Sequence, residues 1–333
     1  MARDPLLGSP DMGVIEVDKL RARGARMIVD RPWADVMLDD AVTAVRHGSF
    51  AAAVPVLAAT RGDPELRALR VEALSRAAMG ASTAIERLIQ QDRSNPDLWL
   101  WLGRTLVEQA WQLKPDVRAR AVQAHRLQSF QQAMDSARRP LLTAASLIPA
   151  DPVPWEAMMW VALGLDRPRS DKDSVWFEAA RRYPTLFPAN VARLTTLSPA
   201  WGGTAQEMLE FARTQAARAP ESDPLPALVP LAHFENAAAG RSPMSRGAWF
   251  PEEALREIVA AAGRWWQRGR HPRGIEAHNI FGAAFYTADL RRPARGHLAR
   301  TGGRGSRLPW SHLGDPAHQY QRACARLNVP VPA

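Results

Sequence analysis

The feature that most constrains how this chain folds is a recurring dipeptide, in which an Asp or Asn precedes a Pro. The pairs are Asp63-Pro64, Asn95-Pro96, Asp151-Pro152, Asp223-Pro224 and Asp315-Pro316. An Asp or Asn side chain accepts hydrogen bonds from the first free amides of a helix, and Pro at the first helical position loses no hydrogen bond. Apolar residues then follow at helical spacing, as at Leu98, Leu102 and Leu106. Each pair therefore predicts a helix start, and the absence of a convincing strand run predicts an all-α fold.

The composition agrees with a helical protein that has a buried core. Hydrophobic residues make up 46% of the 333 residues, which excludes wholesale disorder, and abundant Ala and Leu favour helix. Cys324 is the only cysteine, so an intramolecular disulfide and a CxxC site are excluded. No apolar run approaches the length of a membrane span, and the N-terminus has no uninterrupted apolar segment. We therefore expect no signal peptide, no membrane-spanning helix and a cytoplasmic location.

The predicted helices also pair. The stretch "ARRPLLTAASLIPADPVPWEAMMWVALG" alternates small and large residues, with Ala137, Leu141, Ala144 and Trp155 as examples. This spacing resembles the tetratricopeptide repeat, in which small residues let two antiparallel helices approach and large residues fill the gap. A second match is "IEAHNIFGAAFYTADLRRPARGHL", with Phe281, Gly282, Phe285, Ala294 and Leu298 at the same offsets, and "NPDLWLWLGRTL" and "HGSFAAAVPVLA" give half-matches.

The resemblance implies antiparallel helical-hairpin repeats, a TPR-like α-solenoid with degenerate repeats and one helical insertion. We expect a single continuous array over residues 31–328, with the insertion at about 112–136. Residues 1–30 are expected to form a loosely ordered N-terminal segment and residues 329–333 a tail, because chain ends without anchoring contacts order poorly.

Three further stretches resemble a bacterial family of unknown function built on such repeats. They are "EQAW" at 108–111, "SFQQAMDSARRPLLTAASLIPADPVPW" and "SPAWGGTAQEMLEFAR". The family has a Trp-Gly-Gly-Ser/Thr element before a helix and a late Pro-Trp, which Pro309-Trp310 matches here. Trp111 is followed by Gln112-Leu113 where the family has Arg-Gly. The resemblance implies a fold and no reaction.

The Trp-Gly-Gly element itself permits two interpretations, a phosphate-binding turn or a connector between helices. Thr204 and Glu207 form an S/T-x-x-E capping box, in which each side chain accepts from the other residue's backbone amide. Paired glycines, Gly202 and Gly203, allow a turn that other residues resist, and Trp201 precedes them. The Lys of a phosphate loop is absent, so we interpret the element as a structural connector.

Candidate binding residues lie on the sides of predicted helices that face the concave groove of tetratricopeptide arrays. Aromatic and charged residues on such a groove are suited to peptide recognition. The candidates are Trp101, Arg104, Glu108, Glu156, Trp160, Asn279 and Tyr286. The alternative is that the inserted helix packs over the groove and buries Trp101 and Trp160.

A non-enzymatic scaffold or accessory protein that binds a protein or peptide is the leading functional hypothesis. The formal charge of +9, carried almost entirely by Arg, leaves a nucleic-acid-binding regulator as an alternative, although the arginines are scattered among acids. An enzyme or small-ligand protein with a cavity between insertion and repeats is a second alternative.

The sequence offers no catalytic residue, metal site or cofactor motif. His233-Phe234-Glu235 has the H-x-E spacing of a zinc deaminase but lacks the P-C-x-x-C that completes it, and no G-x-S-x-G elbow occurs. We expect no metal and no cofactor, while the oligomeric state stays unpredicted.

Overall fold

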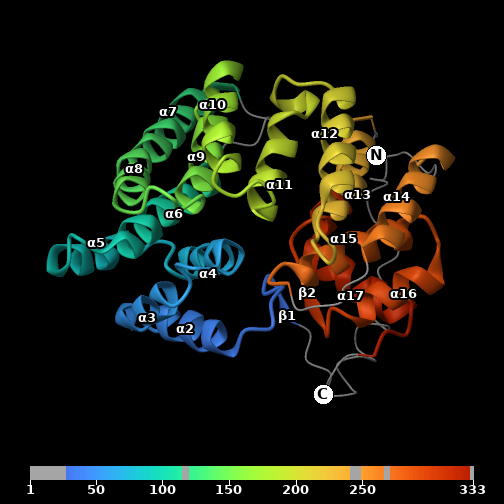
Figure 1. Cartoon of the computed structure of the whole chain (residues 1–333), viewed down its shortest axis with the longest axis horizontal. Coiled ribbons are helices and arrows are strands. Elements are labelled where there is room, and N and C mark those ends of the chain that lie inside the picture. Colours follow the sequence, from blue (N-terminus) through green and yellow to red (C-terminus); the bar gives the residue numbers. More distant parts are fainter. Residues whose placement is uncertain (1–27, 115–119, 241–248, 266–270, 331–333) are drawn as a thin grey trace, which may run out of the picture. The chain divides into compact units, whose positions relative to one another are not determined.

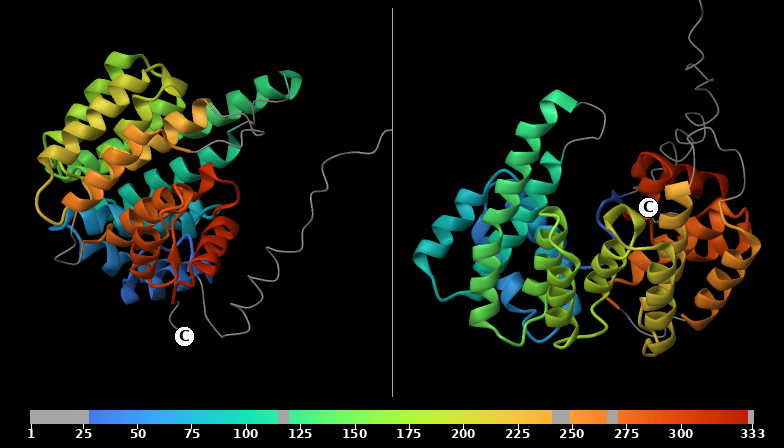
Figure 2. Two further views of the ribbon diagram at one scale, coloured as in Figure 1. Left: turned by 90° about the vertical axis from the view of Figure 1, so that its right-hand side faces the viewer. Right: turned by 90° about the horizontal axis from the view of Figure 1, so that it is seen from above.

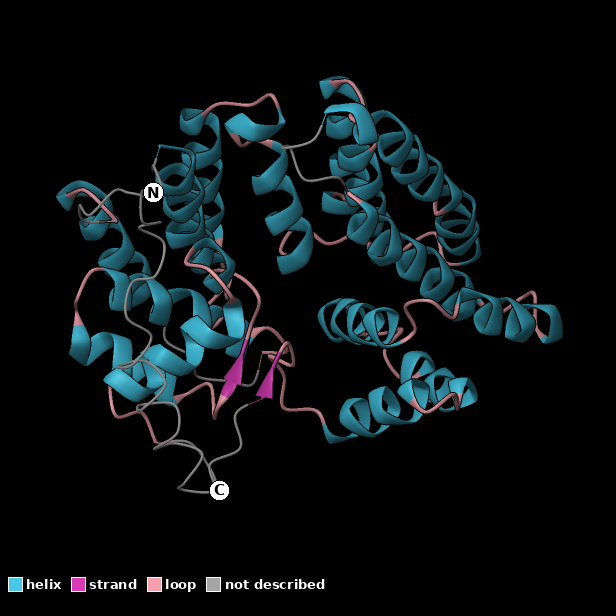
Figure 3. Cartoon of the chain, turned by 180° about the vertical axis from the view of Figure 1, so that it is seen from behind, coloured by secondary structure: helices cyan, strands magenta, loops and turns pink. Residues whose placement is uncertain are grey.

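The computed structural model describes residues 28–114, 120–240, 249–265 and 271–330, and helices dominate these ranges (Figure 1, Figure 3). The predicted all-α class is therefore confirmed. The strands found there are two residues long, β1 (Ile28–Val29) and β2 (Arg304–Gly305), which pair in parallel. No helix within the described ranges has the length and apolar character to cross a membrane.

The chain divides into two compact units, an N-terminal unit of residues 35–208 and a C-terminal unit of residues 28–34 and 209–330. The expectation of one continuous array over residues 31–328 therefore stays a prediction. Most of the segment expected to be loosely ordered, residues 1–27, and the tail residues 331–333 lie outside the described residues.

The N-terminal unit is built from helices that pack successively on one another (Figure 1, Figure 2). They are α2 (Val36–Arg46), α3 (Ala53–Ala58), α4 (Pro64–Ala77), α5 (Ser82–Gln91), α6 (Pro96–Leu113), α7 (Arg120–Ser136), α8 (Arg138–Leu147), α9 (Val153–Gly164), α10 (Arg169–Ala180) and α11 (Phe187–Thr196). Helix α6 is the longest and contacts α4, α5, α7, α8 and α9. Helix α7 occupies the segment in which the sequence predicts an insertion.

The C-terminal unit is also helical. Helix α12 (Ala205–Arg218) begins in the N-terminal unit and continues into this one. The other helices are α13 (Leu228–Gly240), α14 (Glu252–Arg264), α15 (Gly274–Thr287), α16 (Arg291–Ala299) and α17 (Pro316–Arg326). Helix α15 is central, because α13, α14, α16 and α17 all contact it.

The Asx-Pro pairs mark helix starts as predicted. The side chains of Asp63, Asn95 and Asp315 accept hydrogen bonds from the amides of the first turns of α4, α6 and α17. Asp151 accepts from the amide of Val153, where α9 begins. The remaining pair, at residues 223 and 224, precedes a short 3-10 turn that leads into α13.

Two glycines let neighbouring helices approach closely. A Cβ atom placed on Gly103 of α6 would lie 2.6 Å from Leu141 Cδ2 of α8, and one on Gly282 of α15 would lie 2.4 Å from Leu298 Cδ2 of α16. These distances are shorter than carbon–carbon contact allows. Both leucines are fully buried, so each glycine receives the side chain of the opposite helix.

A buried guanidinium joins three helices of the N-terminal unit. Arg67 of α4 is 1% exposed and lies 2.7 Å from a carboxylate oxygen of Asp97 on α6. Its Nε donates over 2.6 Å to Asp151, which lies just before α9 and accepts from the amide of Val153. Because a buried charge without a partner is costly, these ion pairs hold α4, α6 and the start of α9 together.

The contact between α15 and α16 yields a stability prediction. In Gly282→Ala the new methyl group overlaps Leu298, and overpacking of this kind lowers the free energy of unfolding by about 1–3 kcal/mol. Urea denaturation of the full chain measures the change. Gly263→Ala on α14 is the control, because nothing lies within 4 Å of the added atom and Ala favours helix. Equal effects of the two substitutions would contradict the packing argument.

Candidate functional site

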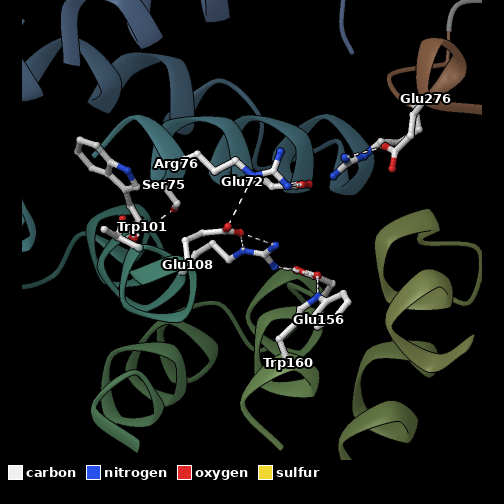
Figure 4. A network of polar contacts seen from close by, with 11 residues as sticks. Glu72, Ser75, Arg76, Trp101, Glu108, Glu156, Trp160 and Glu276 are labelled. Atoms are coloured by element: carbon white, nitrogen blue, oxygen red, sulfur yellow. Dashed lines mark hydrogen bonds and ion pairs between the residues drawn. The ribbon is translucent and has the colours of Figure 1, made fainter. Parts of the chain in front are cut away.

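Arg104 of α6 joins the members of a polar network in the N-terminal unit, of which Figure 4 labels Arg76, Glu108 and Glu156. Its Nη1 donates to both carboxylate oxygens of Glu156 on α9, over 2.9 and 2.8 Å. Its Nε donates over 3.0 Å to Glu108, one helical turn further along α6. Arg76 of α4 approaches the same Glu108 at 3.6 Å. The network therefore connects the side chains of three helices.

The charged side chains of this network are paired with one another. Arg104 is 7% exposed and Glu156 is 3% exposed. Burial lowers the pKa of Arg104, but the negative charges of Glu156 and Glu108 more than offset it, and the net pKa lies above the ordinary value. Arg104 is thus permanently charged and already bound to carboxylates. We conclude that Arg104 and Glu156 are structural, which corrects the prediction that they face an open groove.

Trp101 is also a core residue. Its side chain is fully buried, and its ring centroid lies 6.1 Å from that of Phe50. Its carbonyl accepts hydrogen bonds from Ser75 and Thr105. The predicted role in a groove is wrong for Trp101, because a partner has no access to it.

Trp160, in contrast, is only half-buried and belongs to a group of aromatic rings. Its Nε1 donates to Glu156 over 2.8 Å, which connects it to the polar network (Figure 4). Its ring meets that of Trp111 on α6, with centroids 6.1 Å apart and planes at 89°. The Trp111 ring in turn meets Trp201, at 5.8 Å and 79°. We call Trp111, Trp160 and Trp201 the tryptophan cluster.

A lysine ammonium lies against this cluster. The Nζ atom of Lys114 is 4.2 Å from the ring centroid of Trp201 and 5.0 Å from that of Trp111. A cation over an indole face is attracted by the negative potential of the ring. Partial burial lowers the pKa of Lys114. Trp111 Nε1 is buried and has no hydrogen-bond partner among the described residues. The cluster therefore accepts a cation and retains an unused donor.

The Trp-Gly-Gly turn positions Trp201. Gly202 has φ of +87°, which favours glycine, and a Cβ on Gly203 would lie 2.1 Å from the carbonyl oxygen of Leu197. The amide of Thr204 donates to Glu207, and the amide of Glu207 donates to the Thr204 hydroxyl, as the capping-box pattern predicts. The turn is thus a connector that ends in a capped helix.

The sequence does not predict this cluster. Trp111 and Trp201 were each marked by family-like stretches, "EQAW" and "SPAWGG", but nothing in the sequence indicates that the two stretches meet. Trp160 was a candidate for a groove and not for contact with either tryptophan. The one signal that the two stretches share is an Ala-Trp dipeptide, at residues 110–111 and 200–201.

The candidates Asn279 and Tyr286 lie in the C-terminal unit, on α15. Asn279 is fully buried: its Nδ2 donates to the carbonyls of Ile275 and Arg304, and its Oδ1 accepts from Trp310 Nε1. Its predicted role in a groove is therefore wrong. Tyr286 is half-exposed and borders a surface pocket.

A buried histidine, His278, pairs with a partly buried one, His297, in the same unit. The Nδ1 atoms of His278 and His297 lie 3.0 Å apart, so one ring donates to the other only while the second is neutral. Burial, together with the charges of His297 and Arg300, lowers the pKa of His278 to about 3. Burial and Arg300 lower the pKa of His297 to about 4. Both rings are thus neutral near pH 7.

Comparison with known proteins identifies no family for this chain. No protein-family model, no curated protein and no solved structure matches it. Among the described residues, no three His, Cys, Asp or Glu side chains are grouped so as to hold a metal ion. In the N-terminal unit, the tryptophan cluster with Lys114 is therefore the candidate binding site.

A prediction follows for the polar network. Arg104→Met leaves Glu156 and Glu108 without their guanidinium in the interior, so the free energy of unfolding falls by about 3–5 kcal/mol. The double variant Arg104→Met, Glu156→Met recovers part of this loss. Arg138→Met is the control, because its pair with Asp135 is exposed and contributes at most about 1 kcal/mol. A loss as small as that of the control would contradict a structural role for Arg104.

The histidine pair predicts a dependence of stability on pH. In the unfolded chain a histidine has a pKa of about 6.5. Between pH 6.5 and about 4 the unfolded chain therefore binds protons that the folded chain does not, and stability decreases as the pH falls.

The measurement is the slope of the unfolding free energy against pH, from urea denaturation. The double variant His278→Gln, His297→Gln has a smaller slope than the wild type, by about 1.4 kcal/mol per pH unit for each histidine at the acidic end. His318→Gln changes an exposed histidine of α17 and leaves the slope unchanged. An identical slope in the double variant would show that the pair is not neutral in the folded protein.

Proposed function

We propose that this chain is a non-enzymatic interaction module that binds a protein or peptide partner through the tryptophan cluster. The convergence of Trp111, Trp160 and Trp201 from three separate segments carries the proposal. The three rings are half-buried, so each is held by the protein and still offers surface to a partner. Tryptophan is among the residue types that contribute most to binding at interfaces.

The partner contributes an Arg or Lys side chain to the cluster. The support is Lys114, whose ammonium lies over the faces of Trp201 and Trp111. Because the Trp201 ring stands at 79° to the Trp111 ring, the two rings offer such a cation two differently oriented faces. A cation of the partner replaces Lys114 there, over the faces of Trp201 and Trp111.

The polar network orients one ring of this cluster, that of Trp160. Glu156 accepts from Trp160 Nε1 while it binds Arg104, so the orientation of the indole depends on a buried ion pair. The charged residues of the predicted groove thus position an aromatic surface, in place of contacting the partner themselves.

We also propose that the helices are degenerate tetratricopeptide-like hairpins. The close approach of α6 to α8 at Gly103, and of α15 to α16 at Gly282, is the contact that the small and large anchors of such repeats make. An array of this kind takes its function from what it binds, which agrees with an interaction module.

A displayed library of random peptides tests the proposal with the full chain as bait. We expect the selected peptides to be enriched in Arg or Lys. Trp201→Ala lowers their affinity about tenfold, because a partly desolvated cation–π contact and its apolar area are lost. Lys114→Ala raises the affinity several-fold, because the internal cation no longer competes for the ring faces. Fluorescence anisotropy of a labelled selected peptide measures both changes.

The matched control is Trp99→Ala. Trp99 is a half-exposed tryptophan of the same unit, and its Nε1 donates to the carbonyl of Arg93, outside the cluster. This variant retains wild-type affinity. Selected peptides without basic residues would contradict the proposed partner chemistry. Equal binding to wild type and Trp201→Ala would contradict the proposed site.

A further inference from the structure

The C-terminal unit carries a surface pocket of about 330 Å³ that is separate from the tryptophan cluster. Asp289 lies in the connection between α15 and α16, Arg291 begins α16, and Arg322 and Arg326 come from α17. The volume lies at the lower end of the range of small-molecule sites. Three arginines and one aspartate give this pocket a formal charge of +2.

The arginines of this pocket are available for an anionic ligand. Arg322 and Arg326 are exposed and form no ion pair with any described residue. The Nη2 atom of Arg291 donates to the carbonyl of Arg326 over 3.0 Å, which connects α16 to the last turn of α17. Guanidinium groups bind phosphate oxygens through paired, charge-assisted hydrogen bonds. The positive charge of this pocket therefore favours an anion such as a phosphate group.

Two aromatic rings also line the pocket, together with Thr287, Gln319 and two leucines. Tyr286 and Trp249 both border the pocket. Tyr286 packs against Trp310 at 6.3 Å, and Trp249 packs against Phe234 at 5.8 Å, so neighbouring rings hold both of them in place. A flat heteroaromatic ring stacks on such side chains.

We propose that this pocket binds a mononucleotide. Arg322 and Arg326 bind its phosphate, the base lies against Tyr286 or Trp249, and the Asp289 carboxylate accepts from a ribose hydroxyl. A phosphate, a sugar hydroxyl and an aromatic ring on one small molecule match the arginines, the aspartate and the aromatic residues of the lining. The site is independent of partner binding by the tryptophan cluster.

Isothermal titration calorimetry on the full chain tests the proposal with adenosine 5′-monophosphate, adenosine and inorganic phosphate. We expect saturable binding of the monophosphate, with adenosine and phosphate each at least about tenfold weaker. The double variant Arg322→Gln, Arg326→Gln weakens binding of the monophosphate by at least about tenfold, because both phosphate contacts are lost. Both positions are exposed, so the variant folds as the wild type does, and circular dichroism checks this.

The control is the double variant Arg218→Gln, Arg256→Gln, which removes the same charge from exposed positions on α12 and α14. It retains wild-type affinity. Three outcomes overturn the proposal: no saturable binding at millimolar monophosphate, equal losses in the two double variants, or phosphate alone binding as tightly as the nucleotide. Binding of single-stranded RNA without binding of the monophosphate also overturns it, and points to a polyanion surface.

Discussion

Buried guanidinium groups on neighbouring helices are the interaction on which the N-terminal unit depends. Arg67 of α4 binds Asp97 of α6 and Asp151 ahead of α9, and Arg104 of α6 binds Glu156 of α9. Each of these side chains is almost entirely buried, and an unpaired charge there costs several kcal/mol. A displacement of α6 along its axis would separate both sets of partners. The ion pairs therefore fix the relative positions of the three helices. Apolar packing alone would tolerate small shifts of one helix against another.

The candidate binding surface rests on this arrangement. Glu156 is held by Arg104 and in turn accepts from Trp160, whose ring meets Trp111. Trp201 reaches the same place from the glycine turn, and Lys114 covers two of the rings. An aromatic surface on loosely held side chains would pay an entropic cost on binding, and rings held by packing and a hydrogen bond avoid most of it.

Much of the local structure is predictable because it depends on residues close in sequence. The capped starts of α4, α6 and α17 and the capping box at Thr204 follow from hydrogen bonds that span two or three residues. Gly282 and Leu298 stand at offsets that match the small and large anchors of the repeat, and in the structure the two residues are in contact. The prediction that Trp101 and Arg104 face an open groove was wrong. Whether a helical residue is exposed depends on which other elements cover that face of the helix.

The sequence by itself determined that this chain is helical, where most helices begin, and that the Trp-Gly-Gly stretch is a connector. Those properties are set by backbone capping, helical periodicity and the conformational freedom of glycine, which act over a few residues. Only the tertiary structure decided that Trp111 and Trp201, separated by residues 112–200, share one cluster. It also decided that Arg104 is bound to carboxylates and that His278 faces His297, because long-range contacts depend on how whole helices pack.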